Sequence, residues 1–135
     1  MLTVTDSLTA GWLLLAGRVL IALVYLVSGL HKAVWYQKAV DEFRMAGAPL
    51  IPITLPGTIL LHIAAAICLI LGTYTQLAAL ALVVFTIPAT LMVHGFWRST
   101  GVERLIDSRI FLGNLGLIGG LLTIAAVGPG HYALS

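Results

Sequence analysis

The fold is decided by residues 11–30, which read GWLLLAGRVLIALVYLVSGL and contain a single charged side chain, Arg18. A helix needs about 20 apolar residues to cross the hydrocarbon core of a bilayer. The stretch is longer than the apolar core of a signal peptide, about 7–15 residues, and no lysine or arginine precedes it. Residues 11–30 are therefore predicted to form a membrane-spanning helix that stays in the protein.

Three further apolar stretches follow, at about 55–72, 77–97 and 110–128. A spanning segment must satisfy its own backbone hydrogen bonds, and none of these stretches alternates between polar and apolar residues as a barrel strand does. We therefore predict an all-α fold, an integral membrane four-helix transmembrane bundle that forms one domain over residues 1–135.

The connections between the predicted spans differ in length. In residues 36–46 apolar side chains recur at roughly helical spacing, and Gly47 follows. This pattern predicts a short amphipathic helix at the interface after the first span. Pro49, Pro52 and Pro56 are expected to keep the chain non-helical until the second span begins. Residues 73–76 are predicted to form a tight hairpin, and residues 98–109 a longer connection.

The composition excludes several classes of protein. Hydrophobic residues make up 60% of the chain, charged residues 9%, and the mean hydropathy is +1.07. A typical soluble domain is about 45–50% apolar and about 25% charged, so a soluble domain and a disordered chain are both excluded. A formal net charge of +2 is too small for a surface that follows nucleic-acid phosphates. The single cysteine, Cys68, cannot form an intrachain disulfide and is expected to be a small buried apolar residue.

The basic residues predict an orientation. Six of the seven lysines and arginines fall in the connections 31–54 and 98–109, which share one face of the membrane because two spans separate them. They are Lys32, Lys38, Arg44, Arg98, Arg104 and Arg109. Cytoplasmic connections carry such an excess, so both termini are expected on the non-cytoplasmic side.

Four polar side chains, one from each span or its end, are expected at one depth. His31 and His94 lie near the ends of the first and third spans, and His62 and Asn114 lie near the beginnings of the second and fourth. Arg18 precedes His31 by about 20 Å at 1.5 Å per residue, so it belongs to the other half of the bilayer. Ionisable residues inside a membrane are costly and suggest function, so we take these five as candidate cofactor-binding residues.

Structural explanations stand beside the functional ones. Asn114 is also explained by a hydrogen bond to a neighbouring helix, since Gly116 and Gly120 form a GxxxG pair typical of close packing. His31 and His94 are also explained by a place at the membrane surface. Arg18 could reach lipid phosphate, pair with Asp6 or cap backbone carbonyls, or it could contact an anion, a quinone or a partner.

Several chemistries follow from these residues. A carboxylate proton relay is not expected, because no predicted span contains Asp or Glu, and a structural zinc site lacks ligands. A bis-histidine haem on His62 and His94 is a remote alternative. A quinone head group needs one or two donors near the interface and an apolar slot for its tail, and this chain offers both.

Short motifs along the chain resemble the DoxX family of small four-span bacterial membrane proteins. Beside Arg18 they are SGLHK at 28–32, MAGAP at 45–49, LG at 71–72 with TQ at 75–76, NLGLIGG at 114–120 and GPG at 128–130. The chain departs from the family where His62 replaces a frequent glutamate and Gln76 a basic residue.

The resemblance implies a redox-associated subunit in the bacterial plasma membrane rather than a stand-alone enzyme. One branch of the family looks like the membrane subunit of thiosulfate:quinone oxidoreductase, and other members are linked with thiol and superoxide defence proteins. Other membrane or membrane-associated subunits are the expected partners, together with the lipid bilayer. A non-catalytic structural or assembly subunit of a larger membrane complex is the alternative, because the chain is small and its predicted spans lack acidic and redox residues.

Overall fold

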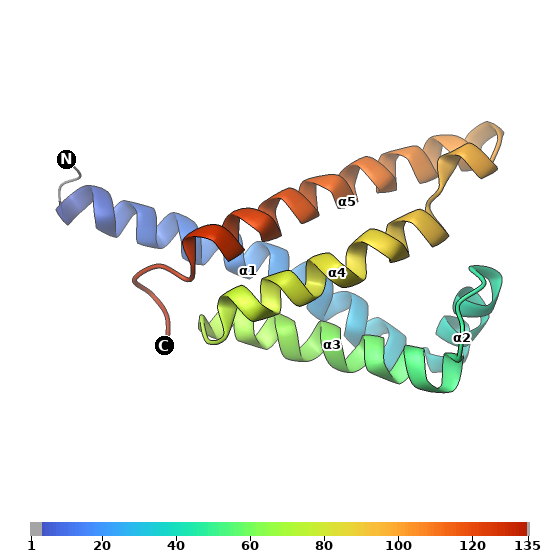
Figure 1. Ribbon diagram of the computed structural model, residues 1–135, viewed down its shortest axis with the longest axis horizontal. Coiled ribbons are helices and arrows are strands. Elements are labelled where there is room, and N and C mark those ends of the chain that lie inside the picture. Colours follow the sequence, from blue (N-terminus) through green and yellow to red (C-terminus); the bar gives the residue numbers. More distant parts are fainter. Residues whose placement is uncertain (1–3, 135) are drawn as a thin grey trace.

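The computed structural model describes the backbone of residues 4–134 and the side chains of residues 10–134 (Figure 1). Asp6, one of the partners considered for Arg18, lies outside the residues whose side chains are described. The described part of the chain is helical and contains no strand. Its elements are α1 (Val4–Val34), α2 (Tyr36–Met45), α3 (Ile51–Leu71), α4 (Thr75–Val93), the single 3-10 turn η1 (Phe96–Arg98) and α5 (Gly101–Val127).

The all-α fold is confirmed, because four helices are long and apolar enough to cross a membrane. These candidate spans are Ala10–Val34, Ile51–Leu71, Thr75–Arg98 and Gly101–Val127. Helices α1, α3, α4 and α5 run along the long axis of the molecule, with α2 and η1 at one end (Figure 1). The beginning of α1, the segment after α5 and the turn between α3 and α4 lie at the other end, so the two basic connections do share one end of the bundle.

The predicted short helix is present as α2, and its end is explained by local hydrogen bonds. Gly47 takes a positive φ of 76° directly after the helix. The amide of Gly47 donates to the Arg44 carbonyl and that of Ala48 to the Phe43 carbonyl, at 3.1 and 3.0 Å. This pair of bonds is the Schellman arrangement that favours glycine after a helix.

Two boundaries differ from the prediction. Helix α3 begins at Ile51 and not near residue 55, because Pro52 lies in its first turn, where an amide proton has no helical partner. Helix α5 begins at Gly101 and not near residue 110. Its first turns hold Glu103 and Asp107, in a segment that was expected to be a connection because of its charge.

The core fills the half of the bundle that contains the α3–α4 turn. Small residues such as Ala22, Ala66 and Ala79 are fully buried there between larger ones such as Leu69 and Leu82. Small side chains let helices approach closely in a membrane protein, where apolar contact with lipid competes with apolar contact between helices. Cys68 is half-buried against this core.

The turn after α3 needs glycine at residue 72 for two reasons. Gly72 has a φ of 75°, and a Cβ there would lie 2.5 Å from Ala133 Cβ and 2.6 Å from Arg18 Nη1. We expect Gly72→Ala to lower the free energy of unfolding by about 2 kcal/mol or more, the sum of backbone strain and overpacking. Equilibrium unfolding in detergent measures it.

Gly47→Ala is the matched control, because Gly47 has a φ of 76° but no atom within 4 Å of the added Cβ. The difference between the two variants isolates the close contact. Equal losses would contradict the crowding inferred at residue 72.

Candidate functional site

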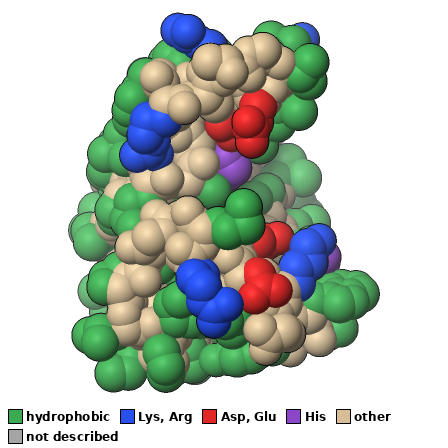
Figure 2. Space-filling model, turned by 90° about the vertical axis from the view of Figure 1, so that its right-hand side faces the viewer, with side chains coloured by type: hydrophobic (Ala, Val, Ile, Leu, Met, Phe, Trp, Pro, Cys, Tyr) green, Lys and Arg blue, Asp and Glu red, His purple; other side chains and the backbone are tan. Residues whose placement is uncertain are grey.

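The α2 end of the bundle encloses a cavity of about 410 Å³. Its size is within the usual range of small-molecule sites. Figure 2 looks onto this end and shows a hollow with acidic and basic side chains on either side. All five helices contribute to the lining: apolar residues include Val24, Phe43, Phe85, Pro88 and Leu117, and the polar ones are Tyr25, Ser28, Lys32, Glu42, Thr54, Thr58, His62, Thr86, Thr90, His94 and Asn114.

The cavity exists because two helices separate toward this end. Helices α1 and α5 are close in the other half, where a Cβ on Gly120 would lie 2.8 Å from Ile21 Cδ1. Toward η1 the two helices diverge (Figure 1). Val24 and Ser28 of α1 and Asn114 and Leu117 of α5 then face the same empty space.

His62 is the most buried of the predicted histidines. Its side chain belongs to α3, is 3% exposed and lines the cavity. The ring meets Tyr25 and Phe85 edge-on, with centroids 5.2 and 4.6 Å apart. Neither ring nitrogen has a hydrogen-bond partner among the described residues. Buried polar atoms are usually paired, so the His62 ring keeps hydrogen-bonding capacity that the described residues leave unused beside the cavity.

Tyr25 lies beside His62, and its hydroxyl proton is already used in a hydrogen bond to Thr86. The Tyr25 and Thr86 oxygens are 2.7 Å apart, and Thr86 Oγ1 donates to the Leu82 carbonyl at 2.6 Å. A hydroxyl has one proton, so Thr86 must accept from Tyr25. The Tyr25 oxygen therefore keeps lone pairs that can accept a hydrogen bond from a ligand.

Asn114 joins two helices at the cavity wall. Its Nδ2 donates to Thr90 Oγ1 at 3.0 Å, so the predicted hydrogen bond to a neighbouring helix is present. Asn114 also lines the cavity, and the two explanations coexist. The GxxxG prediction holds for Gly120 alone, because a Cβ on Gly116 would meet no atom within 4 Å.

His94 lines the same cavity and has a partner that the sequence prediction missed. Its Nδ1 lies 3.3 Å from Oδ1 of Asp107, and Asp107 Oδ2 accepts a hydrogen bond from Ser99 at 3.0 Å. Asp107 belongs to α5, which begins at Gly101, so this carboxylate lies on the helix just before the predicted fourth span at about 110–128. Glu103 and Asp107, four residues apart, were the available signal of a helix at that point.

Lys32 was used in the prediction as one of the basic residues that define the orientation. It is half-buried, lines the cavity, and donates from Nζ to Ser28 Oγ at 2.5 Å. Among the described side chains no carboxylate lies within ion-pair distance of it. Tyr25, Ser28 and Lys32 line the cavity at helical spacing, and this spacing was visible in the sequence.

His31 does not join the other three polar side chains. It is exposed, is not part of the cavity lining, and packs against Trp35 with ring centroids 4.6 Å apart. The structure thus brings His62, His94 and Asn114 to one cavity. His31 lies at the same end of the bundle, but on a side of α1 that does not line the cavity.

Arg18 lies in the other half of the bundle and is fully buried. Its Nη1 donates to the carbonyls of Leu69 and Ile70 at 2.7 and 3.3 Å, and its Nη2 donates to the Tyr132 carbonyl. Of the alternatives considered for Arg18, the described structure has the capping of backbone carbonyls. The last carbonyls of a helix lack helical partners, so this guanidinium completes the end of α3.

Comparison with known proteins places the chain in a family. The family model described as DoxX matches residues 13–95. Inner membrane protein YphA of Escherichia coli is 26% identical, with 90% of this chain and 87% of that protein covered. Inner membrane protein YqjF of the same organism is 29% identical, with 89% and 87% covered. ER-derived vesicles protein ERV29 of Saccharomyces cerevisiae is 26% identical over 92% of this chain but 33% of its own length. No solved structure gives a significant match.

Proposed function

This multi-pass membrane protein belongs to the DoxX family, and from that premise we propose that it is a redox-associated membrane subunit whose cavity binds a quinone head group. The observation that carries the proposal is His62, whose two ring nitrogens are buried without a partner in the cavity wall. A quinone carbonyl accepts a hydrogen bond from a ring N–H, and a quinol hydroxyl donates one to an unprotonated nitrogen.

The other cavity groups suit the same ligand. The Tyr25 oxygen can accept a hydrogen bond beside His62. The Lys32 ammonium, on α1 like Tyr25, can donate one. Apolar side chains such as Phe85, Pro88 and Leu117 supply the surface for a flat ring and an isoprenoid tail.

The location of the cavity supports the proposal as well. It lies at the end of the bundle that carries six of the seven basic side chains, which we assign to the cytoplasmic side of a bacterial inner membrane. Both termini then lie outside the cytoplasm. The relatives from Escherichia coli carry the name of inner membrane proteins. Electrons would come from a partner subunit, since the chain itself holds a single cysteine.

The test is equilibrium binding of radiolabelled short-chain ubiquinone to the protein in lipid nanodiscs, with empty nanodiscs as the baseline. His62→Phe keeps an aromatic ring between Tyr25 and Phe85 but removes both nitrogens. We expect it to bind at least about tenfold more weakly, the effect of one to two hydrogen bonds.

The matched control is His31→Phe, because His31 lies on the same end of the bundle but outside the cavity. Its binding should equal that of the unmodified protein. Binding of the unmodified protein no greater than to empty nanodiscs would refute the quinone site, as would equal binding by the His62 and His31 variants.

One observation favours the structural or assembly subunit as a second candidate. A Cβ on Gly113, Gly116 or Gly119 of α5 would meet no atom within 4 Å, so these glycines are not used for packing inside the chain. Exposed glycines on a spanning helix suit contact with another helix. Purification in a mild detergent, followed by mass spectrometry, distinguishes the two functions: a stoichiometric protein partner without a bound quinone supports the assembly role.

A further inference from the structure

We propose that His94, held by Asp107 and Ser99, is the proton acceptor for a phenolic hydroxyl bound in the cavity. The inference rests on the proposed function, because a hydroquinone is a phenol, and it deepens that function by naming the group that exchanges the proton. The hydrogen-bond chain His94–Asp107–Ser99 carries the argument, together with the place of His94 in the cavity wall.

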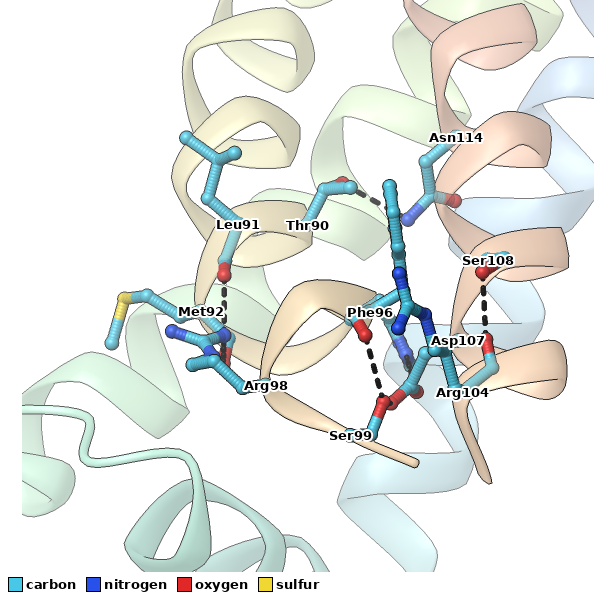
Figure 3. A network of polar contacts seen from close by, with 11 residues as sticks. Thr90, Leu91, Met92, Phe96, Arg98, Ser99, Arg104, Asp107, Ser108 and Asn114 are labelled. Atoms are coloured by element: carbon cyan, nitrogen blue, oxygen red, sulfur yellow. Dashed lines mark hydrogen bonds and ion pairs between the residues drawn. The ribbon is translucent and has the colours of Figure 1, made fainter. Parts of the chain in front are cut away.

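The chain of hydrogen bonds fixes the direction of each donor. Asp107 Oδ2 lies 3.0 Å from Ser99 Oγ, and a carboxylate cannot donate, so the serine hydroxyl does (Figure 3). Asp107 Oδ1 lies 3.3 Å from His94 Nδ1, which must likewise carry the proton. A neutral imidazole with its proton on Nδ1 has an unprotonated Nε2. That nitrogen is therefore the one that can accept a proton.

The pair connects the cavity with the outside of the bundle. The His94 side chain lines the cavity and is 26% exposed, and that of Asp107 is 20% exposed. Neither is sealed in the core, and neither is freely solvated. A proton taken from a ligand can thus leave at this end of the molecule without crossing the apolar core.

The other charged and titratable groups at the cavity come from three elements. Tyr25 and Lys32 of α1, Glu42 of α2 and His62 of α3 line it, but among the described residues no hydrogen bond or ion pair joins any of them to His94. Arg98 of η1 is close in sequence, and its Nη2 donates to the carbonyls of Leu91 and Met92 at 2.6 and 2.7 Å (Figure 3). Among the described residues Asp107 is the carboxylate within ion-pair distance of His94.

The proposed step is an acid–base transfer without a change of oxidation state. The O–H bond of the phenol breaks, its proton forms an N–H bond at His94 Nε2, and the electron pair stays on the phenolate oxygen. The resulting imidazolium donates to the phenolate from Nε2 and to Asp107 from Nδ1. Asp107 accepts from Nδ1 and so keeps the ring proton there, which gives the carboxylate the role of a positioning residue.

A nitrophenol with a short alkyl chain tests the step, because its phenolate is coloured and its phenol is nearly colourless in the visible. In nanodiscs that contain the unmodified protein, we expect phenolate colour at a pH where the same probe in empty nanodiscs stays protonated. Asp107→Asn should give roughly tenfold less phenolate at that pH, because the amide can donate to Nδ1, which moves the ring proton to Nε2 and removes the acceptor. Ser99→Ala should give a smaller decrease in the same direction.

Asp41→Asn is the matched control, since Asp41 is an exposed carboxylate on α2 that pairs with Arg44 and does not line the cavity. Its phenolate signal should equal that of the unmodified protein. Nitrogen-15 NMR of histidine-labelled protein gives a measurement that needs no ligand, and a His94→Gln variant identifies which of the four histidine signals belongs to His94. We expect the proton of neutral His94 on Nδ1.

The outcomes separate the two proposals. Loss of phenolate in Asp107→Asn, with ubiquinone binding unchanged, supports the role of His94. An unchanged phenolate signal in that variant, or a proton on Nε2 by NMR, overturns the proton role and leaves the quinone site standing. If the unmodified protein binds neither ubiquinone nor the nitrophenol, both proposals fail.

Discussion

Arg18→Met is expected to lower the free energy of unfolding by about 3 kcal/mol or more. The substitution leaves the carbonyls of Leu69, Ile70 and Tyr132 without the donor that now serves them. Removing the charge does little to offset this loss. In the unfolded state the separate helices are already inserted in lipid, so the cost of placing the arginine in the membrane is present in both states. Unfolding in mixed detergent micelles measures the loss.

The stability of an Arg18→Lys variant separates the contribution of the positive charge from that of the guanidinium's hydrogen-bond geometry. Arg18→Lys keeps the charge but replaces a planar fork by one ammonium group, so we expect a smaller loss that is still measurable. Arg44→Met is the control, because Arg44 is exposed on α2 and its 3.5 Å pair with Asp41 is a surface pair worth about 0–1 kcal/mol. A stability of Arg18→Met close to that of the control would show that the buried guanidinium contributes nothing to folding.

Gly29→Leu is expected to force α1 and α3 apart beside the cavity. A Cβ on Gly29 would lie 3.0 Å from both His62 Cβ and Ile63 Cγ1, so the larger side chain has no room. Overpacking of this kind costs about 1–3 kcal/mol. Because the contact is with His62 itself, binding of ubiquinone should weaken together with stability, as the nanodisc assay can measure.

Gly17→Leu on the same helix is the control, since a Cβ there would meet no atom within 4 Å. Leucine is a better helix former than glycine, so this variant should be as stable as the unmodified protein or more so. If Gly29→Leu kept both stability and binding, the close approach of α1 and α3 at His62 would be refuted.

The spans and α2 could be predicted from the sequence because each depends on local properties. Length and apolarity define a spanning helix, and helical spacing followed by Gly47 defines α2. The beginning of α5 could not be placed by the same rule, because Glu103 and Asp107 extend the helix with charged residues that resemble a connection. The missing carboxylate partner of His94 followed from that one misplaced boundary.

The position of the candidate site along the bundle axis could be predicted from the sequence, but the side of each helix that faces the cavity could not. His31 and Lys32 lie at almost the same depth, yet Lys32 lines the cavity and His31 packs outside against Trp35. A rotation of about 100° per residue around the helix axis separates them. Which side of α1 faces α4 and α5 depends on packing between distant segments, and the spacing of Tyr25, Ser28 and Lys32 was the one local hint.

The bond between Arg18 and the Tyr132 carbonyl has a consequence for the biosynthesis of the protein. Helix α1 leaves the ribosome first and must enter the lipid with a positive charge that no described neighbour on its own helix neutralises. Two of its acceptors arrive with α3, and the third arrives 114 positions later in the sequence. A nascent chain arrested before residue 132 should therefore expose an incompletely solvated arginine, the kind of signal by which membrane quality control can distinguish an unfinished polytopic protein from a finished one.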